Sequence, residues 1–156
     1  MADNIQSFIK ELAFEEALTN HLLGHGWNEV MMNPTEEQLV ENWGRIIYDN
    51  NREIDKLGNH PLTASEMQQV MDKVNMVGSP YEMNRFINAQ EVCIKRDNEA
   101  DTNNCGKEVY LKIFDPMEIS SGQSRYQIAR QPKFKSADEM GGDRRGDVML
   151  LINGMP

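Results

Sequence analysis

The apolar residues of this chain change their spacing near residue 90, and this change constrains the fold more than any other feature. Before that point they recur at intervals of three and four residues, which indicates amphipathic helices. After it they form short runs bounded by polar and glycine-rich segments, which are typical of strands. Helices followed by strands within 156 residues predict an α/β fold of the α+β type, with helices packed on a mixed or antiparallel sheet.

The first half is expected to form four helices. A helix over residues 4–23 would carry the apolar stripe Ile5, Phe8, Ile9, Leu12, Leu18, Leu22 and Leu23. The next two helices have capping boxes at their starts, Thr35 with Gln38 and Thr63 with Glu66. Their expected buried residues are Leu39, Trp43, Ile46 and Ile47, then Met67, Val70, Met71 and Val74. Ser79-Pro80 begins a fourth helix that we expect to reach about Ala89.

The second half is expected to form strands over Glu91–Arg96, Val109–Phe114 and Asp147–Ile152, with another beginning at Tyr126. Polar loops would occupy Asp97–Gly106 and Lys135–Gly146. We therefore expect one domain covering residues 1–156, with a helical first half (about 4–89) and a strand-rich second half (about 91–152).

The dipeptide Asn153-Gly154 predicts a hairpin turn after the last strand. A hairpin needs a partner strand, and none follows, so we expect a truncated domain. The last strand would then have an open edge. An open apolar edge recruits other strands, so we expect self-association or coverage by the loop Lys135–Gly146.

The net charge of −9 argues against a domain that holds DNA by itself, because DNA binders normally present a basic face. The sequence has no apolar run long enough to cross a membrane and no secretory leader pattern. Two cysteines, Cys93 and Cys105, are too few for a disulfide scaffold. We expect reduced thiols and a cytoplasmic location.

Three carboxylates stand out by their positions. Glu15 falls within the apolar stripe of the first helix and Glu16 lies nearer its other side, where burial would require a partner or a metal. A break in the helix near residue 13 would instead expose both. Asp147 enters an apolar strand and is suited to Mg²⁺, unless it only caps the preceding loop.

The histidines His21 and His25 are four residues apart, which is a spacing that metal ligands use on helices. The zinc-protease motif requires glutamate after the first histidine, and this chain has Leu22 there. We therefore interpret them as a surface pair at a helix end.

Three segments together resemble the N-terminal nuclease domain of type I restriction enzyme R subunits. These are the subunits that cleave DNA and contain the motor domains of the enzyme. The three segments are Phe14–Leu18 leading to Gly26-Trp27, Asn59–Glu66, and Arg145–Pro156. The last is the most specific, because it is similar to that family's signature of arginine-x-aspartate, an apolar strand and Asn-Gly-Leu-Pro. Here Met155 replaces the usual leucine, and residues 97–106 and 135–142 match nothing in the pattern.

The resemblance implies a PD-(D/E)xK restriction-endonuclease-like core, in which Asp147 is a catalytic residue and metal ligand and Glu15 supports the site. It also implies Mg²⁺ as cofactor, ATP for motor domains beyond this chain, and double-stranded DNA with methyltransferase and specificity subunits as partners. The Glu-x-Lys strand of that core does not occur after Asp147 in these 156 residues. The fragment alone is therefore expected to be inactive.

Two other interpretations stay open. One is a non-catalytic interaction or relic domain, which the acidic charge and the missing Glu-x-Lys permit. The other is a DNA mimic, which we regard as the weaker because 16 basic residues are interspersed among 25 acidic ones. The coding sequence downstream of residue 156 separates them: an in-frame Glu-x-Lys and helicase motifs would favour the nuclease.

Overall fold

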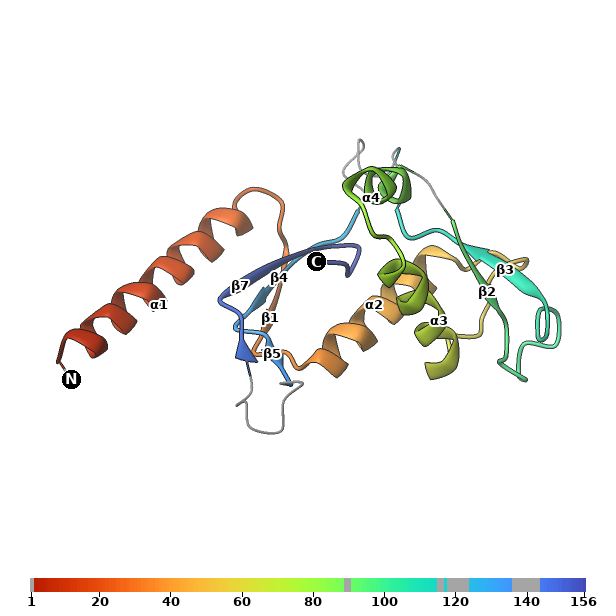
Figure 1. Cartoon of the computed structure of the whole chain (residues 1–156), viewed down its shortest axis with the longest axis horizontal. Helices are drawn as coiled ribbons and strands as arrows, with labels where there is room; N and C mark the ends of the chain where they lie inside the picture. The colour runs from red at the N-terminus through yellow and green to blue at the C-terminus, as the bar shows by residue number, and fades with distance from the viewer. Residues whose placement is uncertain (1, 89–90, 115–116, 118–123, 136–143) are drawn as a thin grey trace. The chain divides into compact units, whose positions relative to one another are not determined.

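The computed structural model describes residues 2–88, 91–114, 117, 124–135 and 144–156 (Figure 1). Its helices are α1 (Ala2–Leu23), α2 (Glu36–Asn50), α3 (Ala64–Asn75) and α4 (Pro80–Ile87). Its strands are β1 (Glu29–Met32), β2 (Val92–Lys95), β3 (Glu108–Leu111), β4 (Tyr126–Arg130), β5 (Lys133–Phe134), β6 (Arg144–Arg145) and β7 (Val148–Ile152). Helices and a mixed sheet confirm the α+β class. Within this part of the chain, none of the helices is long and apolar enough to cross a membrane.

The chain divides into two compact units. The first combines Met1–Leu39 with Arg125–Pro156, and the second is Val40–Ser124. The first unit therefore brings together the two ends of the sequence, and each unit is described separately below. That residues 1–156 fold as a single domain stays a prediction.

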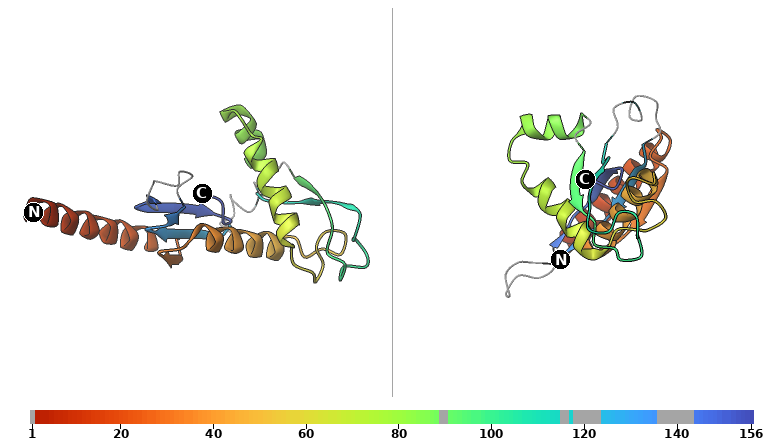
Figure 2. Two further views of the ribbon diagram at one scale, coloured as in Figure 1. Left: turned by 60° about the horizontal axis from the view of Figure 1, so that its bottom comes forward. Right: turned by 90° about the vertical axis from the view of Figure 1, so that its right-hand side faces the viewer.

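The first unit contains a three-stranded mixed sheet in the order β1-β4-β7. Figure 2 shows β4 and β7 side by side. β1 is parallel to β4, with Glu29 opposite Gln127 and Met32 opposite Arg130. β7 is antiparallel to β4, with Val148 opposite Arg130. β4 is thus the central strand of the sheet.

β1 was not predicted from the sequence. Its four residues, Glu-Val-Met-Met, do not alternate between polar and apolar, and three of the four are exposed. The strand forms because it pairs with β4, whose sequence lies almost a hundred residues away. Tertiary pairing of this kind overrides a weak local preference.

The predicted turn after β7 is confirmed. Asn153 and Gly154 both have positive φ, 52° and 84°, as a type I′ hairpin turn requires. Ile152 and Met155 exchange backbone hydrogen bonds of 2.9 and 3.1 Å. Of the expected loop over 135–146, residues 136–143 lie outside the described residues. Its end, β6, is a two-residue strand paired with β5 rather than loop.

The second unit packs α2, α3 and α4 with the antiparallel hairpin of β2 and β3. Its core is formed by Trp43, Ile46, Ile47, Leu57, Met67, Val70, Phe86, Val92, Ile94, Val109, Leu111, Ile113 and Phe114. The predicted capping boxes at Thr35 and Thr63 are both present, which explains where α2 and α3 begin. Gln69 of α3 bonds the backbone of Lys95 in both directions and so ties α3 to β2.

The strand expected over Val109–Phe114 ends earlier, at Leu111. The reason is the buried side chain of Asn51, which takes the place of a further strand partner. Its amide donates to the carbonyl of Lys112 at 2.9 Å and accepts from the Lys112 N–H at 2.8 Å. The backbone polar groups are therefore satisfied without a longer ladder.

Candidate functional site

Glu15 lies on the buried side of α1. Only 4% of Glu15 is exposed, whereas Glu16 is exposed to solvent. The helix does not break near residue 13, so the helical phase that places Glu15 inside the apolar stripe holds. The remaining stripe is buried less than expected, because Ile5, Phe8 and Ile9 are each more than half exposed. The partly or fully buried side is instead formed by Leu12, Glu15, Leu18, Thr19 and Leu22.

The buried Glu15 carboxylate meets two polar side chains at the end of β4. Its Oε2 atom accepts a hydrogen bond of 3.3 Å from Nε2 of Gln131 and lies 3.7 Å from Nη2 of Arg130. Burial of a carboxylate is costly unless it is bonded or paired, and here both partners come from a segment 115 or more residues along the chain. The helix and the central strand are thus joined through Glu15.

Asp147 lies immediately before β7, and its side chain is exposed. Its carbonyl accepts a hydrogen bond of 2.8 Å from the backbone N–H of Gln131. The neighbouring Gly146 N–H donates to the carbonyl of Pro132 at 3.0 Å, so the entry to β7 runs alongside the end of β4. Gln131 therefore bonds both residues singled out in the sequence, the carboxylate of Glu15 through its side chain and the backbone carbonyl of Asp147 through its N–H.

Arg130 supplies the positive charge of this cluster. Its side chain is 16% exposed, and its Nε atom is buried without a hydrogen-bond partner among the described residues. A buried guanidinium close to a buried carboxylate offsets part of the cost of both charges. Sequence reasoning missed Arg130 and Gln131, because nothing in the strand pattern distinguishes them from ordinary strand-end residues.

Asp147 is the residue of this cluster that could bind a hard cation such as Mg²⁺. Asp147 offers an exposed carboxylate, and Mg²⁺ in proteins is commonly bound by one or two carboxylates together with water and phosphate oxygens. Glu15 is suited to a supporting position, since its Oε2 atom already has two partners. No group of three or more histidine, cysteine, aspartate or glutamate side chains that could hold a metal occurs among the described residues.

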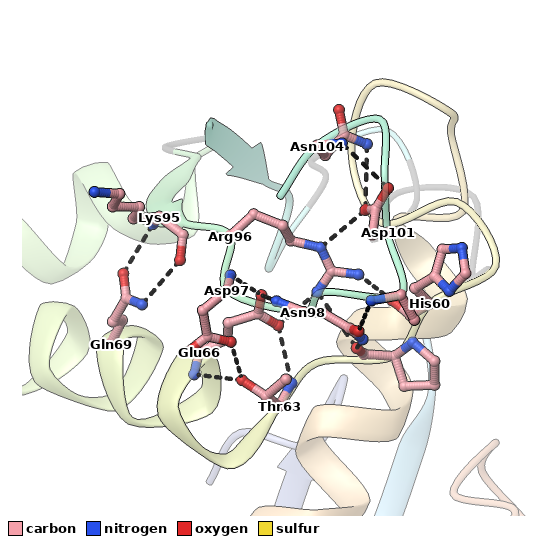
Figure 3. A network of polar contacts seen from close by, with 12 residues as sticks. His60, Thr63, Glu66, Gln69, Lys95, Arg96, Asp97, Asn98, Asp101 and Asn104 are labelled. Atoms are coloured by element: carbon pink, nitrogen blue, oxygen red, sulfur yellow. Dashed lines mark hydrogen bonds and ion pairs between the residues drawn. The ribbon is translucent and has the colours of Figure 1, made fainter. Parts of the chain in front are cut away.

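A second polar cluster, in the other unit, was not predicted as such. Arg96 at the end of β2 is 1% exposed and bonds Glu66 of α3 at 2.5 Å and Asp101 at 3.1 Å (Figure 3). It also donates to the carbonyls of His60 and Pro61. Glu66 in turn accepts from the backbone N–H groups of Thr63 and Asp97 at 2.9 and 2.8 Å.

This Arg96 cluster is a buried ion-pair network that stabilises the fold, and it is not a binding site. The side chains of Arg96 and Glu66 are fully buried and that of Asp101 is 4% exposed, so a ligand has no access to them. Desolvation by itself would raise the pKa of the Asp101 carboxyl, but the hydrogen bonds from Arg96 and Asn104 outweigh it and hold that pKa below its usual value. Of the contacts in this cluster, the sequence predicted only the capping box between Thr63 and Glu66.

His21, His25 and the two cysteines form no metal site in the described residues. Nδ1 of His25 donates to the carbonyl of His21 at 2.7 Å, and the two exposed rings stack with centroids 4.3 Å apart. This arrangement agrees with a surface pair at a helix end. Cys93 and Cys105 are free thiols.

Comparison with known proteins finds the same class that the sequence resembles, the endonuclease subunits of type I restriction enzymes. One relative, from Staphylococcus saprophyticus, is 32% identical over 146 residues, which is 94% of this chain and 14% of the relative. Another, from Staphylococcus aureus strain MSSA476, is 29% identical over 150 residues, 96% of this chain and 14% of the relative. No protein-family profile matches the chain.

The chain thus spans about one seventh of the length of the curated relatives it matches. The resemblance to type I restriction endonuclease subunits is confirmed along nearly the whole chain, through both units.

Proposed function

We propose that this chain forms part of the nuclease domain of a type I restriction endonuclease subunit, with a PD-(D/E)xK core. The full protein would cleave unmodified foreign DNA in a reaction that requires Mg²⁺ and is coupled to ATP-driven translocation. The observation that carries the proposal is the attachment of Glu15 and Asp147 to one residue, Gln131, in a chain similar to such subunits.

In this proposal Asp147 holds the metal and Glu15 supports it from α1. Mg²⁺, when bound, would polarise the scissile phosphate and lower the pKa of an attacking water. The exposed position of Asp147 leaves it accessible to a large substrate such as duplex DNA. The buried Glu15, with Gln131 as its hydrogen-bond donor, would fix the surroundings of the metal and keep the strand entry in place.

The remaining parts of the reaction would come from outside these 156 residues. A glutamate on the next strand would complete the metal site, and a lysine two residues later would stabilise the developing charge. The isolated chain would therefore lack measurable endonuclease activity with Mg²⁺. Cleavage of duplex DNA by the pure chain, abolished by Asp147→Ala, would contradict this.

The partners follow from the same proposal. Double-stranded DNA would be held by the full complex, because a net charge of −9 gives this chain little affinity for phosphates. The methyltransferase and specificity subunits of the enzyme would assemble around the longer protein in the cytoplasm, and ATP would be used by its motor domains.

A non-catalytic interaction domain is the second candidate. It is favoured by a hollow of about 300 Å³ in the second unit, lined by Lys73, Met76, Val77, Glu82 and Arg85. Met76 is 77% exposed and Tyr81, on the adjoining helix α4, is 71% exposed. Such surfaces suit contact with another protein, and they do not require a metal site near Asp147.

A chimera separates the two candidates. Residues 1–156 would replace the matching segment of the Staphylococcus saprophyticus subunit, which would be assembled with its own partner subunits. We expect Mg²⁺-dependent cleavage by the chimera, and loss of cleavage by at least about 100-fold in Asp147→Asn. ATP hydrolysis should continue in both, which shows that the motor is folded. Equal cleavage with and without Asp147→Asn would reject the nuclease proposal.

A further inference from the structure

Gln131 has an unusual backbone conformation for its residue type. Its φ is +49°, in the left-handed region that glycine and asparagine adopt most readily. It directly follows β4, where the ladder with β7 ends. A longer side chain in such a conformation has a steric cost and persists only where the surroundings hold it in place. The contacts of Gln131 show what holds it.

The left-handed conformation brings two successive side chains to one carboxylate. In a regular strand, neighbouring side chains point to opposite faces of the sheet. Here Nη2 of Arg130 lies 3.7 Å and Nε2 of Gln131 lies 3.3 Å from the same atom, Oε2 of Glu15. The backbone N–H of Gln131 stays with the strand pairing and donates to the carbonyl of Asp147 at 2.8 Å.

We propose that Gln131 is a positioning residue, which couples Glu15 on α1 to the entry of β7 at Asp147. Its side chain fixes the direction of the Glu15 carboxylate, and its backbone fixes the strand entry. This inference rests on the proposed function for the significance of the two carboxylates, but the coupling itself is a property of the described contacts.

The chain offers a matched control, Asn33. It has the same φ of +49° and follows β1, the neighbouring strand. Its backbone N–H also donates across the sheet, to the carbonyl of Arg130 at 2.9 Å, and its side chain is exposed. Glycine at either position keeps the backbone conformation and adds the same freedom to the unfolded chain. Only Gln131→Gly removes a donor from Glu15.

The first experiment uses Mn²⁺ as the probe and follows the broadening of backbone NMR signals at residues 147 and 148. The broadening that is lost in Asp147→Asn is the part caused by Mn²⁺ bound at this site. We expect Gln131→Gly to raise the Mn²⁺ concentration for half-saturation by about tenfold, as for other residues that orient metal ligands. Asn33→Gly should match the unaltered chain. Unchanged Mn²⁺ binding in Gln131→Gly would overturn the inference.

The second experiment needs no metal and compares the unaltered chain with Glu15→Ala. We expect this substitution to shift the side-chain amide signal of Gln131 and to speed hydrogen exchange at its backbone N–H, the group bonded to Asp147. The backbone N–H of Asn33 should keep its exchange rate. No change at either group of Gln131 would overturn the coupling.

The two experiments distinguish the inference from the proposed function. If Mn²⁺ does not bind near Asp147 but Glu15→Ala changes both signals of Gln131, the coupling is supported and the metal site is rejected for this chain. If Mn²⁺ binds near Asp147 and neither the Gln131→Gly nor the Glu15→Ala effect appears, the metal site is supported and Gln131 has no positioning role.

Discussion

At the scale of single residues, the two buried carboxylates Glu15 and Glu66 show how much of a site the sequence can predict. The helical spacing placed Glu15 within the apolar stripe and left open whether a break near residue 13 would expose it; the continuous 22-residue helix keeps its phase, and Glu15 is buried. Its partners Arg130 and Gln131 could not be predicted, since they lie more than 110 residues away. For Glu66, the sequence likewise predicted the capping box with Thr63, three residues away. Its ion pair with Arg96 could not be predicted, because it depends on the fold.

The Arg96 cluster gives the first prediction. Arg96→Ala leaves Glu66 and Asp101 as buried charges without their partner, and removal of one member of a buried ion pair costs about 3–5 kcal/mol. The measurement is the free energy of unfolding from urea denaturation. Lys107→Ala, at an exposed position beside the same hairpin, is the control and should cost less than about 0.5 kcal/mol. A decrease of less than about 1 kcal/mol in the free energy of unfolding for Arg96→Ala would contradict a stabilising role of the Arg96 cluster.

The second prediction concerns pH. Desolvation would raise the pKa of Asp101 in the folded protein, but the hydrogen bonds from Arg96 and Asn104 outweigh it and hold this pKa below its ordinary value. This contribution to stability is therefore complete above the unfolded value and is lost as pH falls through the lower, folded pKa. As pH falls below the ordinary pKa of an aspartate, the free energy of unfolding should decrease less in Asp101→Asn than in the unaltered chain. Glu99→Gln, at an exposed neighbouring position, should leave the profile unchanged.

At the scale of elements, local signals predicted those parts of the fold that local physics determines. The starts of α2, α3 and α4 follow from the capping residues Thr35, Thr63 and Ser79, each of which bonds the backbone three residues on. β1 and the early end of β3 were not predictable in this way. One depends on pairing with β4 and the other on the side chain of Asn51.

The strand β7 carries the third prediction. Within the described part of the chain it is an outer strand of the sheet, and Leu150 in its centre is 40% exposed. Because an unpaired apolar edge recruits other strands, we predict that the 156-residue chain self-associates through β7 unless residues of its own cover the edge. Leu150→Lys should lower the apparent mass in light scattering at matched concentration. A monomer in both cases, with the edge of β7 open to water in a crystal structure, would contradict the prediction.

At the scale of the whole molecule, the first unit takes residues from both ends of the sequence, and its sheet therefore needs the strand pairing of β1 with β4 to form. The predicted helical and strand-rich halves describe the order of elements along the chain but not these units. Charge is informative at this scale too, because a net charge of −9 argues against a chain that holds DNA by itself.

The central claim is that the buried Glu15, and not its neighbour, belongs to a site with Asp147. The most direct measurement compares Glu15→Gln with Glu16→Gln in the chimera with the Staphylococcus saprophyticus subunit. The two substitutions remove the same charge from adjacent positions of α1, one buried and one exposed. We expect Glu15→Gln to lower the rate of DNA cleavage by about 10-fold or more at unchanged ATP hydrolysis, and Glu16→Gln to have no effect. Equal rates in the two variants would contradict the claim.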